Sequence, residues 1–123
     1  MDDYKEQQKE ALITTHEYIQ KLKTAIPKAA GELKGQMLDD TVDYLKAILN
    51  GVNFVTEVFN RTQDYLNGDK ERLNKDKYND MVLHFMEAYR EGPKERIGEA
   101  LEEDILTYVT DFDAAIVDLL GLE

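Results

Sequence analysis

The sequence predicts an all-α protein, with residues 1–123 forming one domain, a single antiparallel four-helix bundle. Three observations predict this fold. Apolar residues recur at helical spacing in four stretches, and none alternates as a strand would. Helix-ending residues stand between the stretches: Pro27, Asn67-Gly68 and Gly92-Pro93. With 42% hydrophobic and 33% charged residues, the chain has the composition of a bundle with a solvated exterior.

The first helix is predicted over residues 3–26. Its inward stripe comprises Tyr4, Ala11, Leu12, Thr15, Ile19, Leu22 and Ile26. Proline removes a backbone donor and clashes with the preceding turn, so Pro27 predicts a bend or break that extends over residues 27–35, where Gly31 and Gly35 weaken the helix further.

The second helix shows the clearest pattern, a heptad seam that ends at Asn67-Gly68. The seam comprises Leu38, Val42, Leu45, Leu49, Val52, Thr56, Phe59, Gln63 and Leu66. A second apolar stripe on another side of this helix comprises Ala47, Gly51, Phe54, Val58 and Tyr65. Two apolar sides indicate either a central position in the bundle or a face that joins a partner or a second copy.

The third helix should begin at Asn74 or Asp76, either of which can cap free N–H groups, and should end at Gly92. Its apolar face comprises Tyr78, Met81, Val82, Phe85, Met86 and Tyr89. Pro93 suits the first turn of the fourth helix, which is predicted to run to Leu120 and to stop at Gly121. Its inward residues are Ile97, Leu101, Ile105, Tyr108, Phe112, Ile116 and Leu119.

Negative charge is concentrated at the end of the chain. The net charge is −11, and residues 97–123 contain eight acids and neither lysine nor arginine. Asp104, Asp111 and Asp118 are spaced by seven and share one flank of the last helix. They either pair with lysines of a neighbouring element, such as Lys5, Lys9 and Lys23 of the first helix, or face a basic partner. Glu99, Glu102, Glu103 and Asp113 point elsewhere and have no evident partner in the sequence.

Composition and motifs argue against several functions. The chain has no cysteine and no serine, which removes thiolate metal sites and two common nucleophiles. Basic residues are not grouped with aromatics, so we expect no nucleic-acid binding. The polar N-terminus and the lack of a long apolar run predict a cytoplasmic protein without membrane contact. His16 and His84 lack a metal-binding spacing, and we expect no cofactor and no metal.

Two pairs of carboxylates keep an enzymatic alternative open. Asp40 with Asp43, and Glu99 with Glu102, each lie one helical turn apart. Helical nucleotide pyrophosphohydrolases hold magnesium through such pairs. In a chain with 26 acids such spacings also arise by chance, and a solvated face is the simpler interpretation. Mimicry of nucleic-acid charge is a further, weaker alternative, because only one helix is strongly acidic.

Small size, four helices, an acidic balance and no cysteine together resemble bacterial export chaperones, including those of the flagellar system. The segments Glu87–Gly92 and Ile97–Ile105 also look like a helix–turn–helix part of small helical proteins of unknown function in Gram-positive bacteria. The first resemblance implies a bundle that holds an amphipathic segment of a client protein. Neither resemblance transfers a functional residue.

The sequence therefore favours a non-enzymatic, chaperone- or adaptor-like bundle that binds an amphipathic, basic helix of another protein. The candidate partner-binding residues are Gly51, Phe54, Val58, Glu102, Glu103, Asp104, Asp111 and Asp113. The magnesium-dependent hydrolase is the first alternative. A protein whose stripe serves only self-association, as a homodimer, is the second.

Overall fold

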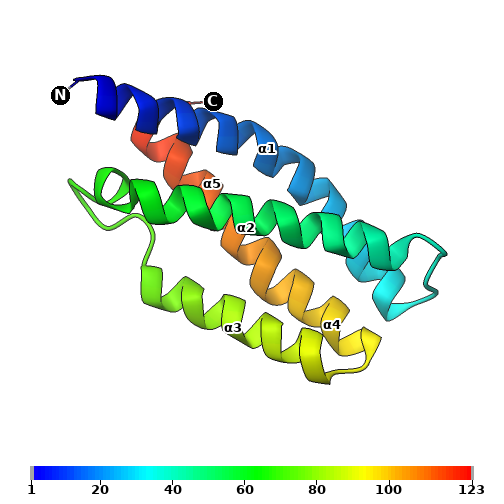
Figure 1. Cartoon of the computed structure of the whole chain (residues 1–123). Coiled ribbons are helices and arrows are strands. Elements are labelled where there is room, and N and C mark those ends of the chain that lie inside the picture. The colour runs from blue at the N-terminus through cyan, green and yellow to red at the C-terminus, as the bar shows by residue number, and fades with distance from the viewer. Residues whose placement is uncertain (1, 123) are drawn as a thin grey trace.

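A computed structural model describes residues 2–122, and within this range the chain contains four helical rods and no strand. The first three rods are α1 (Asp2–Lys34), α2 (Thr41–Leu66) and α3 (Lys75–Glu91). The fourth rod, which we call the last helix, consists of α4 (Lys94–Ala100), a π-helical turn η1 (Leu101–Leu106) and α5 (Thr107–Leu120). Successive rods run in opposite directions (Figure 1), so the predicted all-α four-helix architecture is confirmed.

Of the bend or break predicted near Pro27, the break does not occur, because α1 continues to Lys34 with Pro27 inside it. Proline removes only one helical hydrogen bond, and tertiary contacts hold the following turns in place. Ala29, Ala30 and Leu33 are buried, and the Ala30 carbonyl lies directly beneath Gly98 of α4. Packing of these turns against the last helix therefore outweighs the local cost of the proline.

The seam predicted for α2 is rotated in the structure. Leu38 and Val42 are exposed, and Leu49, Thr56 and Gln63 are only half-buried. The observed seam keeps the heptad spacing and comprises Thr41, Leu45, Ile48, Val52, Val55, Phe59, Thr62 and Leu66. Five of the nine predicted positions thus lie outside the observed seam, on a track that faces a partly open side of the bundle.

The ends of α3 and of the last helix follow the sequence signals. The Asn74 side chain accepts a hydrogen bond from the Lys77 backbone N–H, as an N-cap should. Gly121 ends α5 with a φ of 67°, a left-handed conformation that favours glycine. The π-helical turn at residues 101–106 was not predicted. The flanking residues Ala100, Leu101, Leu106 and Thr107 keep right-handed helical dihedral angles, so the last helix stays one rod.

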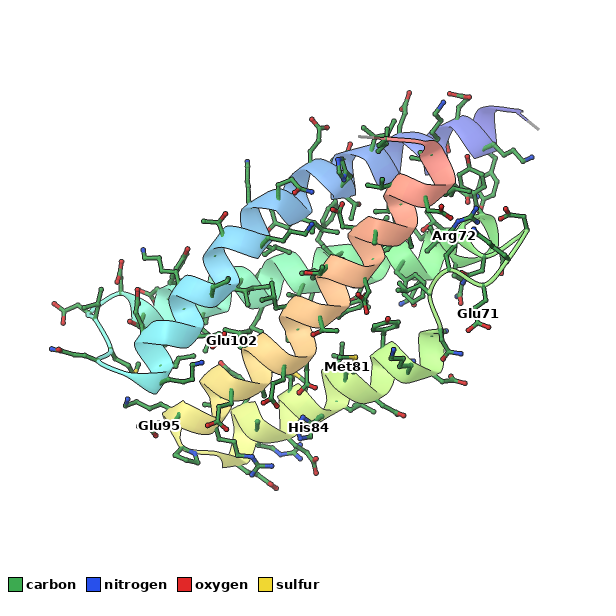
Figure 2. The ribbon with its side chains drawn as sticks, turned by 180° about the vertical axis from the view of Figure 1, so that it is seen from behind. Glu71, Arg72, Met81, His84, Glu95 and Glu102 are labelled. Carbon is green, nitrogen blue, oxygen red and sulfur yellow. The ribbon has the colours of Figure 1, made fainter. Side chains whose placement is uncertain are left out.

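The helices are not packed equally. The last helix lies between α1 and α3 on one face of the molecule (Figure 2), with α2 on the other face. The backbone of α1 lies close to α2 and to all three segments of the last helix, whereas α3 lies close to α4 and η1 only. Tyr108 and Phe112 of α5 are buried in the core, where they contact Tyr78 of α3 and Phe59 of α2. The pair α2–α3 is therefore the loosest seam of the bundle.

Candidate functional site

The carboxylates of the last helix form two rows on opposite sides of it. We call Asp104, Asp111 and Asp118 the α3-facing row. Asp104 accepts a hydrogen bond from His84 Nδ1 at 2.5 Å, and Asp111 accepts one from the Tyr78 hydroxyl at 2.6 Å. Asp118 pairs with Lys70 and Arg72 of the preceding loop. The row therefore faces α3 and its loop. Asp118 pairs with a neighbouring lysine as expected, but that lysine is Lys70 and not one of the first helix.

The second row faces α1. Glu102 pairs with Lys34 near the end of α1 (Figure 2). Asp113 is buried and bonds to His16 Nδ1 at 2.5 Å and to Lys23 Nζ at 2.8 Å. The Gln20 amide also donates to Asp113 at 3.1 Å. The expectation that Glu102 and Asp113 lack partners is thus wrong, because their partners lie far away in the sequence.

These contacts shift the pKa values of several groups. Burial alone would raise the pKa of Asp113, but the hydrogen bonds from Lys23, His16 and Gln20 outweigh it and hold this pKa below its usual value. Burial and the bond to Asp111 raise the pKa of Tyr78 to about 12. The bond to Asp104 raises the pKa of His84, although the side chain is 53% exposed. The carboxylates of both rows therefore bond to other side chains of the bundle itself.

Two acids of the last helix remain available to a partner. Glu99 and Glu103 are exposed, and neither forms an ion pair or a side-chain hydrogen bond with the residues that the structure describes. Of the five acidic candidates, only Glu103 is thus free on the surface. Asp104, Asp111 and Asp113 bond within the bundle, and Glu102 is half-buried beside Lys34.

The apolar candidates on α2 are split between surface and interior. Gly51 and Val58 are buried, whereas Phe54 is 40% exposed. A Cβ at Gly51 would overlap the Tyr18 hydroxyl, so glycine lets α1 approach α2 there. Tyr18 and Phe54 also form an edge-to-face aromatic pair at 5.7 Å. A shallow hollow of about 520 Å³ lies over this contact, and we call it the Tyr18 hollow. It is lined by Thr14, Tyr18, Ala47, Asn50, Gly51 and Phe54.

A second apolar depression lies where α2 and α3 fail to close on each other, and we call it the α2–α3 groove. It is a cavity of about 150 Å³. Leu49, Val52 and Asn53 line it from α2, and Val82, Phe85 and Met86 line it from α3. Ile105 of the π-helical turn lies between them. The same two helices also carry exposed apolar side chains, Val42 on α2 and Leu83 on α3.

Sequence reasoning missed the α2–α3 groove because it placed Leu49 in the buried seam. A signal was present: Thr41, Ile48, Val55 and Thr62 form an unbroken heptad track of β-branched residues beside the predicted one. Choosing that track leaves Val42, Leu49 and Asn53 on the flank of α2. The neighbouring helix then decides whether that flank is covered.

The two carboxylate pairs, Asp40/Asp43 and Glu99/Glu102, do not form a metal-binding cluster in the structure. Among residues 2–122, no group of three or more His, Asp or Glu side chains could hold a metal ion. Asp40 precedes the first turn of α2 without a side-chain capping bond, and Glu102 pairs with Lys34. Within the same residues, no helix has the length and apolar character needed to cross a membrane.

Comparison with known proteins gives one match. Residues 10–114 match the model of a family described as domain of unknown function (DUF8042). These residues extend from the third turn of α1 into α5, so the match includes α2, α3 and the π-helical turn. No curated protein and no solved structure matches the chain. The chain therefore belongs to the DUF8042 family.

Proposed function

We propose that this protein is a non-enzymatic binding module that holds an amphipathic helix of another protein in the α2–α3 groove. The observation that carries the proposal is the open seam. Adjacent helices of a bundle normally close on each other through interdigitated side chains. Here α2 and α3 lie side by side (Figure 1), yet their backbones scarcely approach each other and apolar side chains line the space between them.

An added helix is the natural occupant of such a groove. Its apolar stripe, with side chains at i, i+3, i+4 and i+7, would cover Leu49, Val82 and Met86. Met86 is 46% exposed, and a flexible thioether can adapt to partner side chains of different shape. Burying a large apolar side chain stabilises a complex by about 1.5–3 kcal/mol, so two or three such contacts supply much of a micromolar affinity.

The test compares the two apolar surfaces of α2 by affinity capture from the native host. Four baits are used: the unchanged protein, Met86→Glu in the α2–α3 groove, Phe54→Glu in the Tyr18 hollow, and Glu99→Lys/Glu103→Lys on the last helix. Met86→Glu and Phe54→Glu each place one negative charge on a half-exposed apolar position. We expect a stoichiometric partner that is retained by Phe54→Glu and lost with Met86→Glu.

Three other outcomes would decide against this site. Loss of the partner with Phe54→Glu alone would move the site to the Tyr18 hollow. Loss with Glu99→Lys and Glu103→Lys alone would move it to the exposed acids of the last helix. A partner that survives every substitution, or no partner at any salt concentration, would count against the binding module altogether.

A further inference from the structure

Charge at the rim of the α2–α3 groove has the sign opposite to that of the whole chain. On α2, the groove side carries positions 42, 46, 49, 53, 56 and 60, which share one face at helical spacing. On α3, the corresponding face carries positions 79, 82, 83, 86 and 90. The α2 face carries Lys46 and Asp64, and the α3 face carries Lys75 and Arg90. These two faces therefore hold three cations and one acid, and the acid lies at the end of α2 far from Lys46.

The two cations lie at the same end of the groove. Lys46 precedes Leu49 by three residues, and Arg90 follows Met86 by four. Because α2 and α3 are antiparallel (Figure 1) and Leu49 and Met86 line the same cavity, both positions lie beyond these two residues toward the same end of the groove. The nearest acid to Lys46 along α2 is Asp43, one helical turn away at the same end of the helix, and the two side chains form no ion pair.

Both cations are available to a partner. Each is exposed, and neither forms an ion pair or a side-chain hydrogen bond within residues 2–122. By contrast, Lys23, Lys34 and Arg72 are engaged by carboxylates of the last helix. In a chain of net charge −11, a groove flanked by two unpaired cations is a local reversal of sign. Repulsion from the distant acids is screened within about 8–10 Å at physiological salt.

We propose that the helix bound in the α2–α3 groove carries carboxylates beside its apolar stripe, at the end that meets Lys46 and Arg90. This inference rests on the proposed function and reverses the charge that the sequence alone suggested for the partner. Arg90 offers a planar guanidinium suited to bidentate contact with a carboxylate, and Lys46 supplies a second, mobile charge. The two contacts would fix the direction in which the partner helix lies as well as strengthen binding.

The experiment selects from a displayed library of amphipathic helices. Apolar residues at the stripe vary, and the positions flanking it are Glu, Gln or Lys. The targets are the unchanged protein, Met86→Glu, the double variant Lys46→Glu/Arg90→Glu, and the control Lys9→Glu/Lys21→Glu. The control reverses two exposed lysines on α1, so both double variants carry the same net charge. Circular dichroism checks that each variant is folded.

We expect the unchanged protein and the control to select helices with Glu on one end of the flank. These helices should bind Lys46→Glu/Arg90→Glu on the order of five- to tenfold more weakly. They should fail to bind Met86→Glu. Selection of Lys-flanked helices would overturn the inference and point to the acidic last helix.

Two further outcomes separate this inference from the proposed function. If helices bind in a Met86-dependent way whatever their flanking charge, the proposed function stands and the charge inference fails. If no helix is selected, both fail. The groove could also be filled by a second copy of the chain, and analytical ultracentrifugation of the protein alone tests this. A dimer that dissociates in Met86→Glu would place a second copy in the groove and overturn the inference.

Discussion

The two sides of the last helix are held in different ways. On the α1 side, Gly98 lets the backbones touch, and buried Asp113 collects three hydrogen bonds from His16, Gln20 and Lys23. On the α3 side, Asp104 and Asp111 each accept a single hydrogen bond from a side chain of α3. His84, which bonds to Asp104, stays half-exposed. The same acidic helix thus forms a tight seam with α1 and a looser, polar one with α3.

This difference explains why the groove lies where it does. α3 packs along α4 and η1 but not closely along α2, and only its last-helix side is well covered. A helix anchored on one side can leave the other side apolar and accessible. Elements with fewer buried contacts open at lower free energy, so α3 is the part of the bundle that can adapt to a partner.

The largest effect on stability is expected where a side chain is added to the close contact between Gly98 and α1. In Gly98→Val, the new side chain would meet the Ala30 carbonyl at 2.9 Å and the Lys34 Cγ at 2.8 Å. Because the backbone cannot move aside easily, we expect a loss of about 3 kcal/mol in the free energy of unfolding, measured by urea denaturation. Gly31→Ala is the control: it meets nothing within 4 Å and should stabilise α1 by about 0.5–1 kcal/mol. A neutral Gly98→Val would show that the α1 seam is not close-packed.

The second test compares one carboxylate from each side. Asp113→Ala leaves Lys23 and His16 without their shared acceptor in a buried setting, and we expect a loss of about 2 kcal/mol in the free energy of unfolding. Asp104→Ala removes a single bond to a half-exposed histidine and should cost about 1 kcal/mol. Chemical denaturation measures both.

Glu103→Ala serves as the control for this pair, because Glu103 is exposed and has no partner among the described residues. It should change stability by less than about 0.5 kcal/mol. An Asp104→Ala variant that is less stable than Asp113→Ala would reverse the order of the two seams.

The smallest effect is a pH dependence confined to α3. Asp104 raises the pKa of His84 through their hydrogen bond; Arg96 opposes this and Glu87 favours it. A raised folded-state pKa contributes stability that is complete below the unfolded value of about 6.5 and is lost as pH rises through the folded value. Hydrogen exchange, corrected for intrinsic rates, should therefore show less protection of α3 at pH 8 than at pH 6.

His84→Gln should flatten this pH dependence, because glutamine does not titrate. Amides in the middle of α1 provide the reference. An equal loss of protection in α1 and α3, or a dependence that persists in His84→Gln, would rule out His84 as its source.

Local signals carried much of the fold. The Asn74 cap, the stop at Gly92 and the left-handed Gly121 depend on residues a few positions away, so their geometry is encoded where they stand. The continuation of α1 through Pro27 and the π-helical turn were not predicted, because both depend on packing between residues that are far apart in the sequence. For the turn, two consecutive spacings of four, Ile97–Leu101–Ile105, were a weak sign that the helix is locally wider there.

The sequence by itself determined four helices, most of their ends and the concentration of negative charge in the last one, because these depend on residue type and short-range spacing. Only the tertiary structure decided which neighbour each acid meets and which flank of α2 stays uncovered. Asp113 finds His16 across 97 residues, and no periodicity along one helix can show that contact. The α2–α3 groove likewise exists because α3 packs against the last helix and not closely against α2, and this packing depends on contacts between distant parts of the chain.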